Sequence, residues 1–308
     1  MHKVSVIIPN YNHAPYLQQR IESILNQTYQ DFELIILDDC STDHSMEIIE
    51  QYRGYPQVSH IVYNAKNSGS TFRQWDKGIE LAIGEYIWIA ESDDWMEESF
   101  LASMMLQYSL YPAAVIAFCQ SQNVDINGNI LIRRKSSDEI IVKDGKHFIH
   151  TEMMYENAIY NAGMCLFRKS VYKEVDRDVF INMKYCGDWF LWSLLSEKGD
   201  VIELKNPLNY FRKHNLNVST GAVKDGLSIL EGFSVFLYNR KYITDTKQYL
   251  ISLYRWVSKW KSYHYNKGIT VRTFRFFLKV CPLMVCIYFL YPFIKIWKPL
   301  FVKRKFVA

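Results

Sequence analysis

The stretch GEYIWIAESDDW, at residues 84–95, decides how this chain folds. Residues 86–90 form an apolar run typical of a buried strand, and three acids follow within four residues: Glu91, Asp93 and Asp94. Like charges this close repel one another, so stability alone does not explain them. Open α/β sheets bind ligands beyond the carboxyl ends of their strands, where carboxylates suit Mg²⁺ or Mn²⁺. The alternative is an acidic turn that caps the next helix.

Strands and helices alternate over the first 90 residues. Apolar runs at residues 3–9, 32–37, 58–63 and 86–90 are separated by segments with apolar residues at helical spacing. The alternation predicts an α/β fold with a Rossmann-like, mostly parallel sheet and helices on both faces. Right-handed crossovers would place the loops that follow the strands at one edge of the sheet. The side chains expected to converge there are Tyr11, Asp38, Asp39, Arg73 and residues 91–94.

The first of these loops excludes two common nucleotide sites. A dinucleotide-binding Rossmann loop would have GxGxxG after the first strand, whereas this chain has PNYN at residues 9–12. We therefore expect no nicotinamide or flavin cofactor, and a P-loop is also absent. The six cysteines form no CxxC pair and no zinc spacing, which fits reduced thiols in the cytoplasm.

Charge is divided unevenly along the chain. The whole sequence has a net charge of +4, yet residues 241–308 hold 14 Lys+Arg and a single acid, Asp245. The balance of +13 there predicts an anionic partner for the C-terminal part. We expect a catalytic domain at residues 1–220 and a basic, apolar, helical extension at residues 221–308. Aromatic residues of the extension are mixed with long aliphatic runs, so we expect no nucleic-acid binding.

The extension contains an apolar run without charges at residues 280–294, which Pro282 and Pro292 interrupt. Crossing a bilayer takes about 20 residues, so this run is too short and too broken. An apolar segment between basic residues fits a helix lying on an anionic membrane surface. We therefore expect a cytoplasmic protein, peripheral on the inner face of the cell membrane. The alternative is a core helix packed on the catalytic domain.

Four motifs of the sequence together resemble those of family 2 glycosyltransferases with the GT-A fold. They are VSVIIPNYN at residues 4–12, DFELIILDDCSTD at 31–43, GIELAIGEYIWIAESDD at 78–94 and CGDW at 186–189. The resemblance covers roughly residues 1–220. It implies transfer of a sugar from a nucleotide-sugar, with UDP as the expected nucleotide, to an acceptor hydroxyl with inversion at the anomeric carbon. It also implies a role in assembling a surface polysaccharide or a lipid-linked glycan, with such a glycan as the acceptor.

The resemblance assigns roles to particular residues. Asp188 matches the catalytic base, although an N-cap of the following helix is the alternative. Asp94 is the first choice as a ligand of Mn²⁺ or Mg²⁺ and Asp93 the second, and His214 lies in a segment that the family often places near the metal. Glu91 stands where the family often has Asp. The residues expected to bind the donor are Pro9, Tyr11, Asp38, Asp39, Arg73, Glu91 and Asp93.

A base and a metal on opposite sides of the anomeric carbon predict a single in-line displacement, since retention would need a nucleophile. This chemistry requires Asp94 and Asp188 to serve one site. A nucleotidyltransferase is the first alternative, but it would need a glycine-rich, lysine-bearing first loop, which PNYN lacks. A catalytically inactive scaffold with the same fold is the second alternative.

Overall fold

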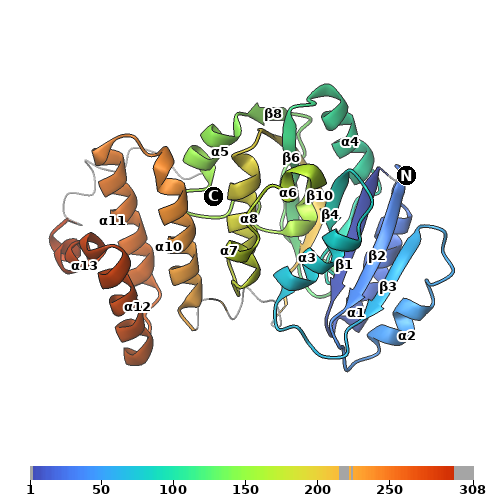
Figure 1. Ribbon diagram of the computed structural model, residues 1–308, viewed down its shortest axis with the longest axis horizontal. Helices are drawn as coiled ribbons and strands as arrows, with labels where there is room; N and C mark the ends of the chain where they lie inside the picture. The colour runs from blue at the N-terminus through green and yellow to red at the C-terminus, as the bar shows by residue number, and fades with distance from the viewer. Residues whose placement is uncertain (1–2, 215–221, 223–224, 295–308) are drawn as a thin grey trace.

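The computed structural model describes residues 3–214, 222 and 225–294 (Figure 1). The first part of the chain folds around a ten-stranded sheet, and the second part consists of helices. The strands are β1 (Val4–Asn10), β2 (Phe32–Asp38), β3 (Val58–Tyr63), β4 (Tyr86–Ile89), β5 (Trp95–Met96), β6 (Ala114–Val124), β7 (Ile130–Ile132), β8 (Ile140–Lys143), β9 (Cys165–Arg168) and β10 (Asp200–Arg212). The helices beside the sheet are α1 (Ala14–Leu25), α2 (Ser45–Glu50), α3 (Thr71–Leu81), α4 (Phe100–Leu110), α5 (Gly145–Glu152), α6 (Lys169–Tyr172), α7 (Asp178–Ile181) and α8 (Gly187–Ser196).

The sheet is mostly parallel, as the alternation of strands and helices predicts. Its main path runs β3-β2-β1-β4-β9-β6-β10-β5, with β7 paired to β6 and β8 paired to β10. Strands β3, β2, β1 and β4 are parallel, β9 runs antiparallel between β4 and β6, and β6 and β10 are again parallel. Every residue of β1, β2 and β4 is buried, which explains their continuous apolar sequences.

Close approach of the chain to β1 depends on Gly84, which precedes β4. A Cβ atom at this position would lie 2.6 Å from the backbone nitrogen of Ser5 and 2.7 Å from the carbonyl carbon of Val4. Only glycine fits here, and its amide donates to the hydroxyl of Ser5 at 2.8 Å. The glycine therefore lets the chain enter β4 directly beside β1, which brings the acidic loop after β4 next to the loop after β1.

Two details differ from the pattern expected from the sequence. The apolar residues at 201–204 and 208–211 indicate two short strands by their pattern, whereas the structure has one strand, β10, with register shifts between Glu203 and Asn209. The apolar sequence AGMCLF at residues 162–167 indicates a strand over this whole stretch, but β9 begins only at Cys165, because residues 162–164 form a short 3-10 helix. Pairing with β6 on one side keeps β10 continuous through Pro207.

The second part of the chain contains α10 (Leu227–Asn239), a 3-10 turn (Arg240–Tyr242), α11 (Thr246–Ser262), α12 (Lys267–Val280) and α13 (Pro282–Ile294). These C-terminal helices lie beyond α8, at the end of the molecule opposite β3 (Figure 1). Trp256 of α11 stacks on Trp189 of α8 with ring centroids 6.1 Å apart. Helix α13 packs on α11 and α12. Among the residues that the structure describes, no helix combines the length and apolar character needed to cross a bilayer.

Candidate active site

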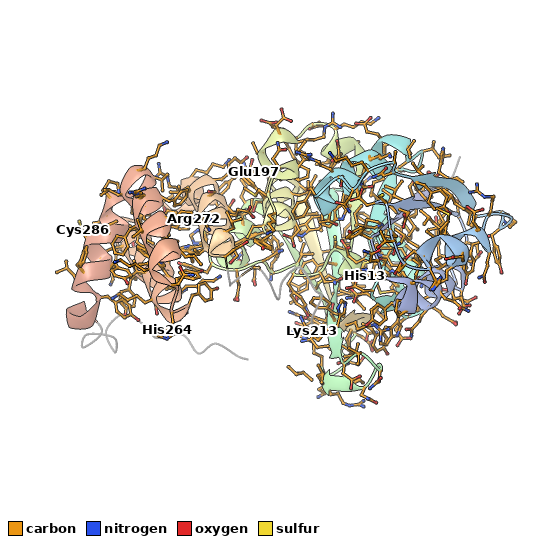
Figure 2. The ribbon with its side chains drawn as sticks, turned by 90° about the horizontal axis from the view of Figure 1, so that it is seen from below. His13, Glu197, Lys213, His264, Arg272 and Cys286 are labelled. Carbon is orange, nitrogen blue, oxygen red and sulfur yellow. The ribbon has the colours of Figure 1, made fainter. Side chains whose placement is uncertain are left out.

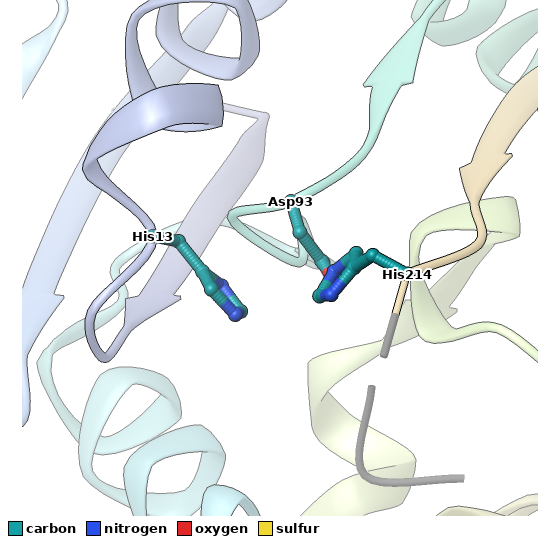
Figure 3. Close-up of side chains that lie close together, drawn as sticks. All are labelled: His13, Asp93 and His214. Carbon is teal, nitrogen blue, oxygen red and sulfur yellow. The ribbon is translucent and has the colours of Figure 1, made fainter. Parts of the chain in front are cut away.

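Three side chains that could hold a metal ion meet where β1, β4 and β10 end (Figure 3). His13 follows β1, Asp93 lies in the loop between β4 and β5, and His214 follows β10. One ligand atom from each lies within 4.8 Å of the others. His214 Nε2 is 2.9 Å from Asp93 Oδ2, and His13 Nδ1 is 2.7 Å from the hydroxyl of Ser92. The order of the strands therefore brings together side chains that are far apart in the sequence: Asp93 is 80 residues after His13, and His214 is 121 residues after Asp93.

The electrostatics of this cluster favour a neutral imidazole at His13 and an ionised carboxylate at Asp93. Burial lowers the pKa of His13, although Asp93 opposes the shift. Burial alone would raise the pKa of Asp93, but its hydrogen bond with His214 and the nearby His13 leave that pKa lowered. Neutral imidazole and carboxylate are the ligand forms that bind divalent metals. The donor set therefore fits a divalent cation that accepts both nitrogen and oxygen ligands.

Asp94 turns away from this cluster into the protein. Its Oδ2 accepts a 2.6 Å hydrogen bond from Asn161 Nδ2, and its Oδ1 accepts a 2.8 Å bond from the backbone N–H of Arg212. Burial, together with Asp93, raises the pKa of Asp94 to about 8. The sequence ranks Asp94 ahead of Asp93 as a metal ligand, whereas the geometry favours Asp93 and gives Asp94 the task of joining the loop to β10.

Glu91 contacts a helix instead of the two histidines. Its carboxylate accepts a 3.1 Å hydrogen bond from Trp75 Nε1 on α3. Burial, followed by the charges of Asp93 and Asp94, raises the pKa of Glu91 to about 8. The extra methylene of Glu, compared with the Asp common in the family, thus extends the carboxylate towards α3.

Arg20 places a fully buried cation behind the acidic loop. Its guanidinium carbon lies 5.1 Å from the ring centroid of Trp88, and burial lowers its pKa to about 10 in spite of the neighbouring acids Asp94 and Glu91. The sequence reasoning missed this residue, although a signal exists. Arg20 occupies the same helical face as Leu17 and Ile24, where an apolar side chain is expected.

The residues expected to bind the donor follow β1 and β2. Asp38 Oδ1 accepts from Asn10 Nδ2 at 2.8 Å, and Asp39 Oδ1 accepts from the amide of Ser68 at 2.9 Å. Both aspartates are buried, whereas the ring of Tyr11 is 47% exposed. Pro9 is buried within β1 beside Leu37 of β2. The structure thus brings these residues together at one edge of the sheet.

Arg73 lies apart from the metal-ligating cluster. It is exposed on α3, and its guanidinium donates a 2.9 Å hydrogen bond to Asn182 Oδ1. The next residue, Gln74, turns the other way and donates to Asp39 Oδ1 at 3.1 Å. In this conformation Gln74, and not Arg73, contacts the predicted base-binding aspartate.

Asp188 lies in the first turn of α8 and is partly buried. Its Oδ1 accepts from the backbone N–H of Trp189 at 2.7 Å, and its Oδ2 accepts from Asn157 Nδ2 at 2.8 Å. Burial raises the pKa of Asp188 to about 7, even though both hydrogen bonds favour the charged form. A carboxyl group with this proton affinity is suited to accept a proton near neutral pH.

A short segment connects the two acidic parts of the site. Asn157 binds Asp188, and Asn161, only four residues further, binds Asp94. Between them the carbonyl of Ile159 accepts from Trp192 Nε1 of α8 at 3.1 Å. The segment at residues 157–161 therefore ties the start of α8 to the acidic loop after β4. Sequence reasoning did not find Asn157 or Asn161, because asparagines in an irregular segment give no pattern.

Comparison with known proteins identifies a family whose sequence model matches this chain. A sequence model described as glycosyl transferase family 2 matches residues 5–176, which is more than half of the chain. This chain belongs to glycosyl transferase family 2. The match includes His13 and Asp93 but ends before Asp188 and His214, so these two residues are placed by the structure alone.

The chain is also similar to bacterial proteins that are named as glycosyltransferases. TuaG of Bacillus subtilis, a putative teichuronic acid biosynthesis glycosyltransferase, is 41% identical over 91 residues, covering 30% of this chain and 36% of that protein. TarP of Staphylococcus aureus, a poly(ribitol-phosphate) beta-N-acetylglucosaminyltransferase, is 36% identical over 108 residues, covering 34% of this chain and 32% of that protein. The chain matches only about a third of the length of these relatives.

Solved structures extend the likeness at the level of the fold. A crystal structure of S. aureus TarS residues 1–349 in complex with UDP-GlcNAc superposes with a TM-score of 0.60 and 18% identity, covering 83% of this chain and 80% of that chain. The prediction of a GT-A-type α/β fold is therefore confirmed.

Proposed function

We propose that this family 2 protein is an inverting, metal-dependent glycosyltransferase that moves a sugar from a UDP-sugar to an acceptor hydroxyl. The observation that carries the proposal is the cluster of His13, Asp93 and His214 at the strand ends. An α/β sheet binds its ligand at this edge. A crystallised neighbour of the same fold is complexed with UDP-GlcNAc, which supports UDP as the nucleotide here.

The ligand set supports Mn²⁺ more than Mg²⁺. Mg²⁺ prefers an all-oxygen octahedron and keeps most of its waters, whereas two imidazoles and one carboxylate offer nitrogen ligands. We therefore assign the metal to Asp93 and His214, with His13 as a third ligand. When bound, the ion would neutralise negative charge on the departing diphosphate.

The donor's base would lie over the loops after β1 and β2. The exposed ring of Tyr11 offers a stacking surface, and the buried Asp39 offers a carboxylate for hydrogen bonding to the base. Pro9 and Asp38 would shape the floor of this subsite, and Glu91 would reach the donor only after leaving Trp75. Arg73 would reach the donor only after leaving Asn182.

Asp188 would act as the base. As the acceptor oxygen attacks the anomeric carbon, its O–H bond breaks and the proton passes to the Asp188 carboxylate, while the bond from carbon to diphosphate breaks on the other side. Asn157 and the Trp189 amide hold the carboxylate in place during the transfer. One displacement without a covalent intermediate inverts the stereocentre.

TuaG is named for teichuronic acid biosynthesis and TarP for poly(ribitol-phosphate), which supports a polymer as the acceptor, and the acceptor we propose lies in a surface polysaccharide or a lipid-linked glycan. We assign residues 1–220 to catalysis and residues 221–308 to attachment on the inner, cytoplasmic face of the membrane. On α13 the side chains of Phe289 and Leu290 are 66% and 53% exposed, and Arg275 and Lys279 lie on the adjoining α12. Exposed apolar groups beside cations are suited to an anionic lipid surface.

Release of UDP measures the proposed activity directly. The protein should release UDP from a UDP-sugar when Mn²⁺ and a glycan acceptor are both present, and Asp188→Asn should lower kcat by at least about 100-fold. Asp178→Asn is the matched control, because Asp178 also lies in the first turn of a helix but is exposed. Asp188→Asn protein with the turnover of the wild type would remove the base assignment.

A further inference from the structure

A carboxylate from the C-terminal helices holds the loop that leads into α8. Glu231 of α10 accepts three hydrogen bonds from successive backbone amides: from Lys184 to Oε1 at 2.8 Å, and from Tyr185 and Cys186 to Oε2 at 2.8 and 3.0 Å. Asp188 lies two residues after the last of these amides. Amides near the start of a helix lack intrahelical partners, and a negative charge there is favourable.

Other contacts fix α10 against the same loop. Asp225 accepts hydrogen bonds from Tyr185 Oη at 2.7 Å and from Lys184 Nζ at 3.2 Å. A Cβ atom at Gly232 would lie 3.1 Å from Trp189 and 3.1 Å from Trp256, so the absence of a side chain lets α10 approach the residue that follows Asp188. The loop is therefore held by hydrogen bonds on one side and by close packing on the other.

The second partner of Asp188 also depends on the C-terminal helices. Asn157, which donates to Asp188, follows Tyr155 by two residues. The hydroxyl of Tyr155 lies 2.7 Å from the hydroxyl of Ser252, and its carbonyl accepts from Lys259 Nζ at 3.3 Å; both partners belong to α11. Helices α10 and α11 thus support Asp188 from its own helix and from the segment opposite.

We propose that Glu231 is a positioning residue for Asp188, and that the C-terminal helices complete the acceptor side of the site as well as attaching the protein to a surface. The inference rests on the proposed function, in which Asp188 is the base. The family match ends at residue 176, so it covers neither Asp188 nor the helices that support it.

The charge of Glu231 also acts on Asp188. Of the ionisable groups near Asp188, Glu231 comes from α10, Cys165 from β9 and Cys186 from the loop itself, while Lys259 of α11 approaches Cys186. Burial accounts for most of the raised pKa of Asp188, and the negative charge of Glu231 adds to it. Removing this charge should therefore make Asp188 ionise at lower pH.

Two variants, Glu231→Gln and Glu231→Ala, separate the effect of the Glu231 charge on Asp188 from the effect of its hydrogen bonds on the loop. Both variants should bind UDP with Mn²⁺ as the wild type does, because the donor residues lie on other elements. Glu231→Ala should show faster hydrogen exchange at the amides of residues 184–186 and a kcat lower by about 100-fold, the usual cost of a misplaced catalytic group. Glu231→Gln keeps one acceptor oxygen and loses the charge, so the acidic limb of its pH–rate profile should move to lower pH.

Glu197→Gln is the matched control. Glu197, labelled in Figure 2, follows the other end of α8. It accepts from Tyr238 Oη at 2.9 Å and pairs with Lys241 at 2.6 Å. The control loses a charged contact between α8 and the C-terminal helices, yet its kcat and pH–rate profile should match those of the wild type. Wild-type turnover and an unshifted profile in both Glu231 variants would overturn the positioning role alone. A wild-type protein that releases no UDP would instead overturn the proposed function.

Discussion

Replacing Asp188 by asparagine should stabilise the protein at alkaline pH, although it lowers kcat by at least about 100-fold. Burial raises the pKa of Asp188 from its ordinary value of 3.8 to about 7. At a pH between these two pKa values, the Asp188 carboxyl group holds a proton in the folded state but has lost it in the unfolded chain. The wild type therefore loses stability as the pH rises from about 4 to about 7, and above pH 7 the loss from this group is complete. Asparagine carries no charge and is free of this loss.

The size of the effect follows from the shift in pKa. About 3 pKa units correspond to about 4 kcal/mol of unfolding free energy. Because the Asp188 side chain is only partly buried, solvent screens part of this energy, and we expect Asp188→Asn to gain about 2–4 kcal/mol over the wild type at pH 8.5. At pH 4.5 the gain should be small. Urea unfolding of both proteins at the two pH values measures the difference in unfolding free energy between them. The other titrating groups are the same in both proteins, so their contributions cancel in this difference.

The reasoning would be refuted if the difference between variant and wild type were the same at both pH values, or if the variant were less stable at pH 8.5. Asp178→Asn serves as the control here as well. Since Asp178 is exposed, this substitution should change the unfolding free energy by less than about 0.5 kcal/mol at either pH.

Three further predictions concern the metal site, the membrane surface and the sheet. Asp93→Asn and His214→Ala should each weaken Mn²⁺-dependent binding of UDP by at least about tenfold. Asp94→Ala should instead lower the unfolding free energy by about 2–4 kcal/mol, because it removes the carboxylate that accepts from Asn161 Nδ2 and from the Arg212 amide. Equal losses of UDP binding in all three variants would contradict this division. Phe289→Glu should reduce sedimentation of the protein with vesicles that contain anionic lipid. Leu106→Glu, on the exposed face of α4, is the control and should not reduce it. Equal vesicle binding by both variants would argue against α13 as the attachment surface. Gly84→Ala should lower the unfolding free energy by about 1–3 kcal/mol or more, because the new Cβ atom meets the backbone of β1. Gly54→Ala, with open space around the new Cβ atom, should be nearly neutral. Thermal unfolding of the two variants and the wild type measures both effects.

Much of the sheet could be predicted because its strands are buried on both faces. The continuous apolar runs in β1, β2 and β4 indicate strands without ambiguity, and the alternation with helices gives their parallel order. Strand β10 was harder, because Lys205, Asn206 and Pro207 interrupt its apolar pattern. Its continuity depends on pairing with β6, which is remote in sequence.

The chemistry of the site was easier to predict than its geometry. An acidic loop after β4 and a helix that begins near Asp188 are visible in the sequence. Which of two adjacent acids faces the histidines is not, since Asp94 is bound by Asn161 and the Arg212 amide, whereas Asp93 contacts His214. The sequence does not single out His13, and its proximity to His214 results from the order of β1 and β10 within the fold.

Calorimetric titration of the wild type with UDP, with and without Mn²⁺, tests the central claim most directly, because it needs neither the sugar nor the acceptor. The account predicts binding that depends on Mn²⁺ and that is lost when Asp93 is changed to asparagine. UDP binding of equal affinity without metal, or no binding in either condition, would contradict it.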